Sequence, residues 1–290
     1  MDQIIAAKLR AAALDFYAVL PDGAGRSMLA YGLNLQNTWH DLLGELPISQ
    51  SSRILDVGCG YGVLSLELAL NGVREIFASD INPDFIKGAE NLTHTITEQG
   101  GLNEDCIIDF KVDDITSLSD PDDYFDFVIV REVFSYLSKP ADAANHLFRV
   151  TKPNGVVCVE DIDDRLYFTF PPPSQDFNAL FEAVDTLQSA KGGDREVGRK
   201  LSVYLGAAGF KVTKIVVPTE PLHLRADPAT GEGEFVINQF VTLKQQIVDA
   251  NLMTPEQFDC HIEAMRKQVP FDQFRMNGRI VVFATKQELT

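Results

Sequence analysis

The chain has 290 residues, of which 45% are hydrophobic, so it can bury the core of one large α/β domain. Its 42 acidic residues outnumber 25 lysines and arginines, and the net charge of -17 disfavours nucleic acids and anionic membrane surfaces as partners. We find no signal-peptide pattern, no apolar stretch of about 18 residues and no metal-ligand spacing of cysteine or histidine, and we therefore expect a cytoplasmic protein without a metal.

Two helical segments precede the first apolar strand. The stretch "DQIIAAKLRAAALDFYAVL" is alanine-rich with apolar residues at helical spacing, and "LNLQNTWHDLLGEL" predicts a second helix after a glycine-rich break. We expect residues 1–50 to form a helical amino-terminal extension or lid that contributes no strand to the sheet.

From residue 53 onward, short apolar runs alternate with helical ones. Five runs predict strands: "RILDVG", "EIFASD", "CIIDFKV", "FDFVIV" and "GVVCVED". Such alternation is typical of βαβ units with right-handed crossovers, and "FKVTKIVVP" and "GRIVVFATK" add two later strands. The sequence therefore predicts an α/β fold, a three-layer doubly wound and mostly parallel sheet of seven strands, over residues 51–220 and 278–290.

The region 221–277 interrupts this pattern with two apolar stripes at helical spacing. The stripes are Val236, Phe240, Leu243 and Ile247, followed by Phe258, Ile262, Met265 and Val269. Core packing is the simplest interpretation of both stripes. A helical cap insertion beside a ligand-binding face is also consistent with a substrate lid.

The first strand ends in a glycine-rich loop. Gly58, Gly60 and Gly62 follow Asp56 in a G-x-G-x-G pattern, whereas a dinucleotide-binding loop reads G-x-G-x-x-G. Asp56 would repel a phosphate and suits a ligand that carries an ammonium group. Since ligands of parallel sheets bind beyond the carboxyl ends of the strands, the loop predicts close contact between its backbone and a cofactor.

Acidic residues also follow the next two strands. Asp80 ends the second strand about 20 residues after the loop, where an acid accepts hydrogen bonds from ribose hydroxyls. Ile81 could cover an adenine ring, and Asp113 and Asp114 could accept from its exocyclic amine. An amino acid end, a ribose and an adenine together indicate S-adenosylmethionine (SAM).

On these residues the chain resembles the class I, seven-stranded, Rossmann-like SAM-dependent methyltransferases. "ILDVGCGYG" is similar to their first motif, Asp80 matches their ribose acid, and "DDI", ending at Ile115, matches their adenine-binding segment. The resemblance covers roughly residues 53–163 and implies SAM as cofactor and an antiparallel last strand.

The segment from "FDFVIVREVFSYLSKP" to "RVTKPNGVVCVED" resembles the small-molecule and natural-product branch of that family. This resemblance implies methyl transfer to a small, apolar or aromatic metabolite, and it implies that Arg131 contacts the cofactor or orders the site. Tyr136 stands where such enzymes commonly have histidine.

Three residues are candidates for catalysis: Glu132, Tyr136 and Asp163. Glu132 could act on the acceptor or contact the cofactor, and Tyr136 could orient the acceptor or form a wall of its pocket. Asp163 belongs to the acidic cluster "EDIDD", in which crowding could raise one pKa and leave a poised base.

Several alternatives remain open at this stage. A protein methyltransferase and a non-catalytic SAM-binding module share the motifs above, whereas an NAD-dependent oxidoreductase fits the glycine spacing poorly. The sequence does not decide whether oxygen, nitrogen or carbon is methylated, nor between a monomer and a homo-oligomer.

Overall fold

The structure is a computed structural model that describes residues 29, 43–98, 101–103, 105–218, 221–224, 232–268 and 273–288. Most of the predicted amino-terminal extension, 1–50, and Val269 of the second stripe lie outside these residues. Within the described ranges, no helix combines the length and the apolar composition needed to cross a bilayer.

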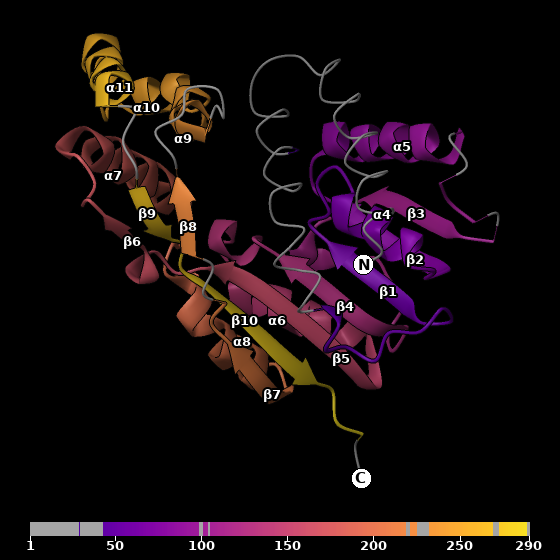
Figure 1. The fold of residues 1–290 in the computed structure, drawn as a ribbon. Coiled ribbons are helices and arrows are strands. Elements are labelled where there is room, and N and C mark those ends of the chain that lie inside the picture. Colours follow the sequence, from indigo (N-terminus) through magenta and orange to yellow (C-terminus); the bar gives the residue numbers. More distant parts are fainter. Residues whose placement is uncertain are drawn as a thin grey trace.

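Seven strands form one sheet in the order β3-β2-β1-β4-β5-β10-β7 (Figure 1). They are β1 (Arg53–Val57), β2 (Glu75–Asp80), β3 (Ile107–Val112), β4 (Phe125–Arg131), β5 (Thr151–Ile162), β7 (Lys211–Val216) and β10 (Arg279–Thr285). Neighbours from β3 to β5 pair in parallel, and β10 runs antiparallel to both β5 and β7. The predicted fold class, with its antiparallel last strand, is confirmed.

Helices cover both faces of this sheet. The helices are α4 (Val63–Leu70), α5 (Pro83–Glu98), α6 (Pro140–Val150) and α8 (Leu201–Ala207). Ile54 of β1 packs in a cluster with Leu64 of α4, whereas its neighbour Leu55 packs on the opposite face with Leu147 of α6 and Leu201 of α8. The central strands are therefore buried on both faces, which is why they are continuous apolar runs in the sequence.

Among the described residues, four short 3-10 helices follow strands or loops. They are η1 (Ile115–Ser117), η2 (Phe134–Tyr136), η3 (Asp164–Leu166) and η4 (Val197–Lys200). Three of them, η1, η2 and η3, follow the carboxyl ends of β3, β4 and β5 within two residues, so they belong to the edge at which an α/β sheet binds ligands.

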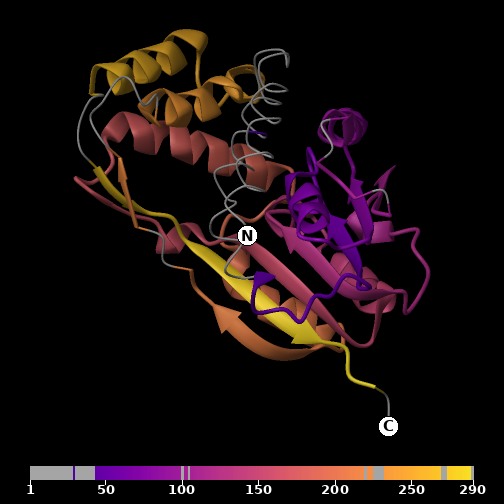
Figure 2. The ribbon, with the colours of Figure 1, turned by 45° about the vertical axis from the view of Figure 1, so that its right-hand side comes forward.

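A second layer of structure stands beyond the end of β5 and the start of β10, and we call it the cap (Figures 1 and 2). It contains α7 (Gln175–Ala190), α9 (Glu232–Val241), α10 (Lys244–Asp249), α11 (Pro255–Gln268) and an antiparallel sheet of β6 (Phe168–Phe170), β9 (Gln273–Met276) and β8 (Pro221–Leu224). The sequence did not predict this small sheet, because strands of three or four residues are too short to show a period of two.

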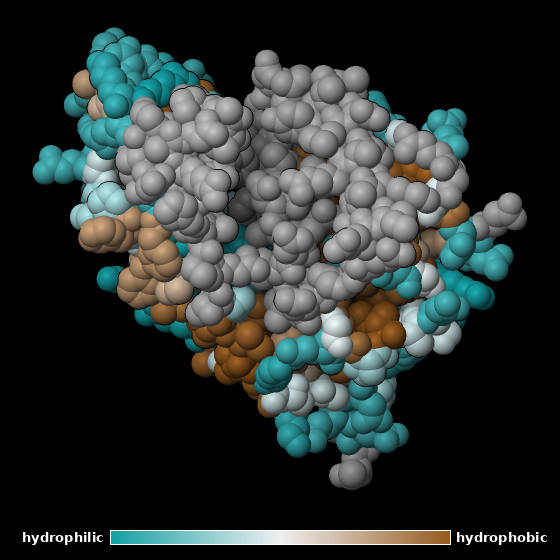
Figure 3. Space-filling view, viewed as in Figure 1, coloured by the Kyte–Doolittle hydropathy of each residue, from teal (hydrophilic) through white to brown (hydrophobic). Residues whose placement is uncertain are grey.

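The two predicted apolar stripes meet inside the cap. Phe240 and Ile247 pack in one cluster with Phe258 and Ile262 of α11 and with Leu180 of α7. The outward surface of α11 is hydrophilic (Figure 3). The stripes therefore form the core of the cap, in agreement with the simpler of the two interpretations.

Candidate functional site

The three glycines after β1 all adopt left-handed backbone conformations, with φ of 73°, 55° and 69° at Gly58, Gly60 and Gly62. A Cβ on Gly58 would lie 2.2 Å from Cγ2 of Val133, and one on Gly62 would lie 2.9 Å from the ring of Phe110. A Cβ on Gly60 would meet no atom of the described residues within 4 Å. Two glycines are therefore required by packing, and Gly60 is the one of the three at which the described residues leave space for a ligand.

Hydrogen bonds fix this loop to the end of β2. The backbone N–H groups of Gly58 and Cys59 donate to the carbonyl oxygen of Ser79, over 2.7 and 3.0 Å. The Gly60 N–H donates to Oδ2 of Asp80 over 2.9 Å, and the Asn82 N–H donates to Oδ1 over the same distance. Because each carboxylate oxygen has a further lone pair, Asp80 can still accept from two ribose hydroxyls.

The residue after Asp80 is suited to an apolar contact. Ile81 is 68% exposed although it is aliphatic, and it lies directly beyond the strand end that carries Asp80. An exposed aliphatic side chain at such a position can cover one face of a flat ring.

The acids after β3 have different roles. Asp113 accepts from the N–H and the hydroxyl of Ser119 and pairs with Lys111 over 2.9 Å; burial would raise its pKa, but these partners lower it. Asp114 caps η1 by accepting from the Thr116 N–H over 2.8 Å, and Ile115 is buried in the core. The structure thus ties both carboxylates to their own loop, Asp113 through Ser119 and Asp114 through Thr116.

Asp56 lies beneath the glycine loop. It is buried and accepts a 2.6 Å hydrogen bond from Oγ of Ser65 on α4. Burial raises its pKa to about 6, against the opposing effects of that hydrogen bond and of Arg131. Glu67 of α4 is also buried, which raises its pKa to about 7, and Arg131 opposes this rise as well. Arg131 therefore lies near two buried acids behind the loop.

Sequence reasoning overlooked Glu67. The sequence signal that could have indicated a buried acid was a single glutamate in the largely apolar helix "VLSLELAL".

The turn after β4 carries the first catalytic candidate. Glu132 has a left-handed backbone with φ of 54°, and its N–H donates to the Glu160 carbonyl over 2.9 Å. Its Oε1 lies 3.2 Å from Nη2 of Arg279, and Nη1 of Arg279 lies 3.5 Å from Oε1 of Glu160. Glu160 and Arg279 are buried, so one arginine of β10 is placed between two acids at the carboxyl ends of β4 and β5.

Beneath this turn, Asp161 holds the backbone of η2. Its carboxylate accepts from the N–H groups of Ser135 and Ile162 over 3.0 and 2.8 Å. Burial, together with the nearby Glu132, raises its pKa to about 7. The next residue of η2, Tyr136, is 65% exposed.

Asp163 is 1% exposed, and its two oxygens accept from Nε and Nη2 of Arg199 over 2.7 and 2.5 Å. Burial would raise its pKa, but Arg199 outweighs burial and holds the pKa below its ordinary value. The structure therefore gives Asp163 an ion pair with η4 and does not bring it beside Glu132 as a poised base.

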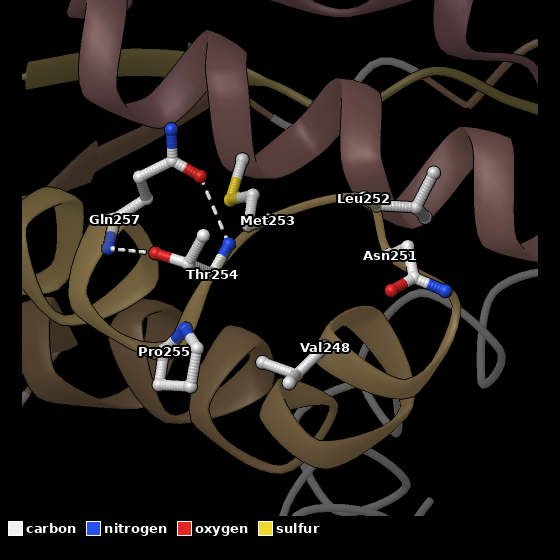
Figure 4. Close-up of a pocket in the computed structure, with 7 residues that line it drawn as sticks. All are labelled: Val248, Asn251, Leu252, Met253, Thr254, Pro255 and Gln257. Atoms are coloured by element: carbon white, nitrogen blue, oxygen red, sulfur yellow. Dashed lines mark hydrogen bonds between the residues drawn. The ribbon is translucent and has the colours of Figure 1, made fainter.

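A separate pocket of about 270 Å³ lies within the cap, between α10 and α11 (Figure 4). It is lined by Val248, Asn251, Leu252, Met253, Thr254, Pro255 and Gln257. The Thr254 N–H donates to Oε1 of Gln257 over 2.9 Å, and the Gln257 N–H donates to Oγ1 of Thr254 over 3.2 Å. This reciprocal pair is a capping box that begins α11, and the pocket has no titratable side chain with which to do chemistry.

Comparison with known proteins assigns the family. A family model described as a methyltransferase domain matches residues 31–215. The chain belongs to the SAM-dependent methyltransferases. The part of the chain that carries the glycine loop, Asp80 and the turn after β4 lies inside the matched range.

Curated relatives match shorter segments of the chain. It is 36% identical over 114 residues to the 2-methyl-6-phytyl-1,4-hydroquinone methyltransferase of Synechocystis sp., covering 39% of this chain and 33% of that protein. It is 30% identical over 123 residues to a ubiquinone biosynthesis O-methyltransferase of Xylella fastidiosa, covering 42% and 46%. The chain thus spans less than half the length of these relatives.

Solved structures share the fold of the chain at low identity. The YcgJ protein of Bacillus subtilis superposes with a TM-score of 0.58 at 18% identity, covering 87% of this chain and 99% of that chain. The [4+2]-cyclase SpnF superposes with a TM-score of 0.55 at 20% identity, covering 87% and 80%. At these identities the likeness concerns the fold alone.

Proposed function

We propose that this chain transfers a methyl group from SAM to a small, apolar or aromatic metabolite. The observation that carries the proposal is the open space at Gly60, beside a carboxylate, Asp80, that is already fixed in position. One relative is named for a phytyl hydroquinone, an aromatic acceptor with an apolar chain, and another is named for ubiquinone biosynthesis; both names support this acceptor class.

The residues at the strand ends fit SAM. Asp80 would accept from the ribose hydroxyls, Ile81 would cover the adenine, and Asp114 with the segment at Ile115 would face the adenine edge. Gly60 offers its backbone to the amino acid end, and Asp56 and Arg131 support the loop from beneath. When bound, SAM supplies an electrophilic methyl group on a positively charged sulfur.

At the turn after β4, the chain's own residues would orient the acceptor. Orientation alone can supply much of the rate of such a displacement. The exposed Tyr136 can direct the acceptor through its hydroxyl. If the acceptor arrives as a hydroxyl or an ammonium group, its proton would pass to the Glu132 carboxylate, whose side chain is 17% exposed. Asp163 has no part in this step, because Arg199 occupies its carboxylate.

A cytoplasmic location and a natural-product acceptor are further parts of the proposal. The four cysteines are all free, which suits a reducing compartment. The net charge of -17 disfavours nucleic acid as a substrate.

The test is incubation of the full chain with methyl-labelled SAM and a protein-free metabolite extract. The expected result is a small-molecule product that gains about 14 daltons, the mass of one CH₂ group. Label that appears only in polypeptides of an unfractionated extract would indicate a protein methyltransferase. Binding of SAM without any labelled product would indicate a non-catalytic module.

A further inference from the structure

Three aromatic rings, one directly before β6 and two on α7, form a wall. Tyr167, Phe177 and Phe181 lie nearly parallel, with ring centroids 5.7 to 6.4 Å apart and interplanar angles of 5° to 18°. Two of the three rings each lie against an arginine. The guanidinium of Arg195 lies 5.1 Å from the Phe181 centroid, and that of Arg275 lies 5.8 Å from the Tyr167 centroid.

The two arginines differ in their partners. Arg195 donates to Asp164 over 2.6 Å and to Oε1 of Gln188 over 2.9 Å, so its charge is balanced and its donors are used. Arg275 interacts with both the ring and the hydroxyl of Tyr167 and makes a long 3.4 Å contact with Oε1 of Gln273, and no carboxylate in the described ranges lies within ion-pair distance of it. In a chain with a net charge of -17, a partly buried arginine without a carboxylate is unexpected.

Two polar atoms at this position lack hydrogen bonds. Arg275 on β9 stands directly opposite Thr169 on β6. Nε of Arg275 and Oγ1 of Thr169 are both shielded from solvent, and neither has a hydrogen-bond partner among the residues that the structure describes. Unsatisfied buried groups are costly, and a guanidinium beside a hydroxyl is the donor set that binds a carboxylate or a phosphate.

A chain of contacts connects the wall to the turn after β4. Arg195 bonds Gln188, and Nε2 of Gln188 donates to the carbonyl of Ser135 in η2, which also contains the exposed Tyr136. An acceptor that lies along the wall could therefore place one end near Tyr136 and its other end near Arg275. The aromatic rings suit an apolar or aromatic body between these ends.

We infer that Arg275 and Thr169 bind an anionic group, a carboxylate or a phosphate, at the far end of the methyl acceptor. The inference rests on the proposed function and narrows its substrate class to acceptors that combine an apolar body with a negative charge.

The test uses three probes, phenyl phosphate, benzoate and neutral phenol, titrated by calorimetry into the full chain with saturating S-adenosylhomocysteine. We expect at least one anion to bind about tenfold or more tightly than phenol, and Arg275→Gln to remove that preference. Arg275→Lys should restore part of it, since lysine keeps the charge but not the planar fork. Preference for phenyl phosphate or for benzoate identifies which anion the site takes.

The control is Lys267→Gln, which removes the same charge from a side chain that is 79% exposed on α11. It should leave all three affinities unchanged. The inference is overturned if neither anion binds, if phenol binds equally well, or if Arg275→Gln keeps the preference. Affinity for S-adenosylhomocysteine is measured separately in each variant. Its absence in the unmodified chain would refute the proposed function, whereas normal affinity without anion binding would refute only this inference.

Discussion

Gln188, near the end of α7 in the cap, donates a 2.7 Å hydrogen bond from Nε2 to the carbonyl oxygen of Ser135 in the turn after β4. The same oxygen accepts from the N–H of Asp194 over 2.8 Å, and the Ser135 N–H donates to Asp161. The backbone of η2 is therefore held on one side by the main sheet and on the other by the cap. This contact couples the two layers at the residue next to Tyr136.

Replacing Gln188 by leucine should loosen this turn. The change removes a buried donor and the acceptor of Arg195, and we expect it to lower the free energy of unfolding by about 1–3 kcal/mol. Urea unfolding measures this loss. Methyl transfer should fall while affinity for S-adenosylhomocysteine stays the same, because the glycine loop is untouched. A variant with full turnover would show that the turn does not depend on the cap.

The glycines of the loop offer a matched pair of substitutions. Gly58→Ala should destabilise the fold by about 3 kcal/mol or more, since it adds a clash with Val133 to the cost of a left-handed alanine. Gly60→Ala should cost only about 1–2 kcal/mol, because its Cβ enters open space.

For ligand binding we expect the opposite ranking, with the larger loss of affinity in Gly60→Ala and the smaller one in Gly58→Ala. In calorimetry, Gly60→Ala should weaken the binding of S-adenosylhomocysteine, because the added methyl group fills the space that we assign to the ligand. Thermal unfolding and titration of both variants give the comparison. Equal affinities in Gly60→Ala and the unmodified chain would place the ligand elsewhere.

Asp80 provides the test of the ribose contact. Asp80→Ala should weaken binding of SAM by roughly 2 kcal/mol through loss of charge-assisted hydrogen bonds. Asp84→Ala, an exposed acid in the first turn of α5, is the control with the same change in charge. If both variants bind SAM equally well in calorimetry, the assignment of Asp80 is wrong.

Two buried acids should give opposite dependences of stability on pH. The folded pKa of Asp163 lies below its ordinary value, so its contribution is present above pH about 4 and is lost as pH falls through the folded pKa. In urea unfolding at a series of pH values, Asp163→Asn should lose this acid-side dependence, and Arg199→Gln should remove most of it as well.

Asp161 has a folded pKa of about 7, above its ordinary value. Between about pH 4 and pH 7 the folded chain holds a proton that the unfolded chain has released, so this residue lowers the free energy of unfolding as pH rises. Asp161→Asn should flatten the pH profile over that interval. A profile that keeps its slope would mean that another group, such as Glu67, carries the titration.

The sequence by itself determined the sheet, the glycine loop and the family. Long apolar runs such as "FDFVIV" and a G-x-G-x-G pattern after a strand are local signals, because a strand buried on both faces and a tight left-handed turn each restrict the residues that form them. The position of Asp80 at the end of β2 followed from chain order and parallel pairing alone.

Only the tertiary structure decided what the individual side chains do. Gly58 and Gly60 look alike in the sequence, but Val133 of another segment lies against one and not the other. Asp161 and Asp163 are two residues apart, yet Arg199 pairs with one, and the backbone of η2 bonds to the other. Arg279 on β10 pairs with Glu132 after β4, and Arg275 on β9 stands opposite Thr169 on β6. Each pair joins segments that are far apart in the chain, so it depends on which strands meet. The charge, burial and packing around a side chain depend on neighbours from segments that are distant in the chain, so no local sequence pattern contains them.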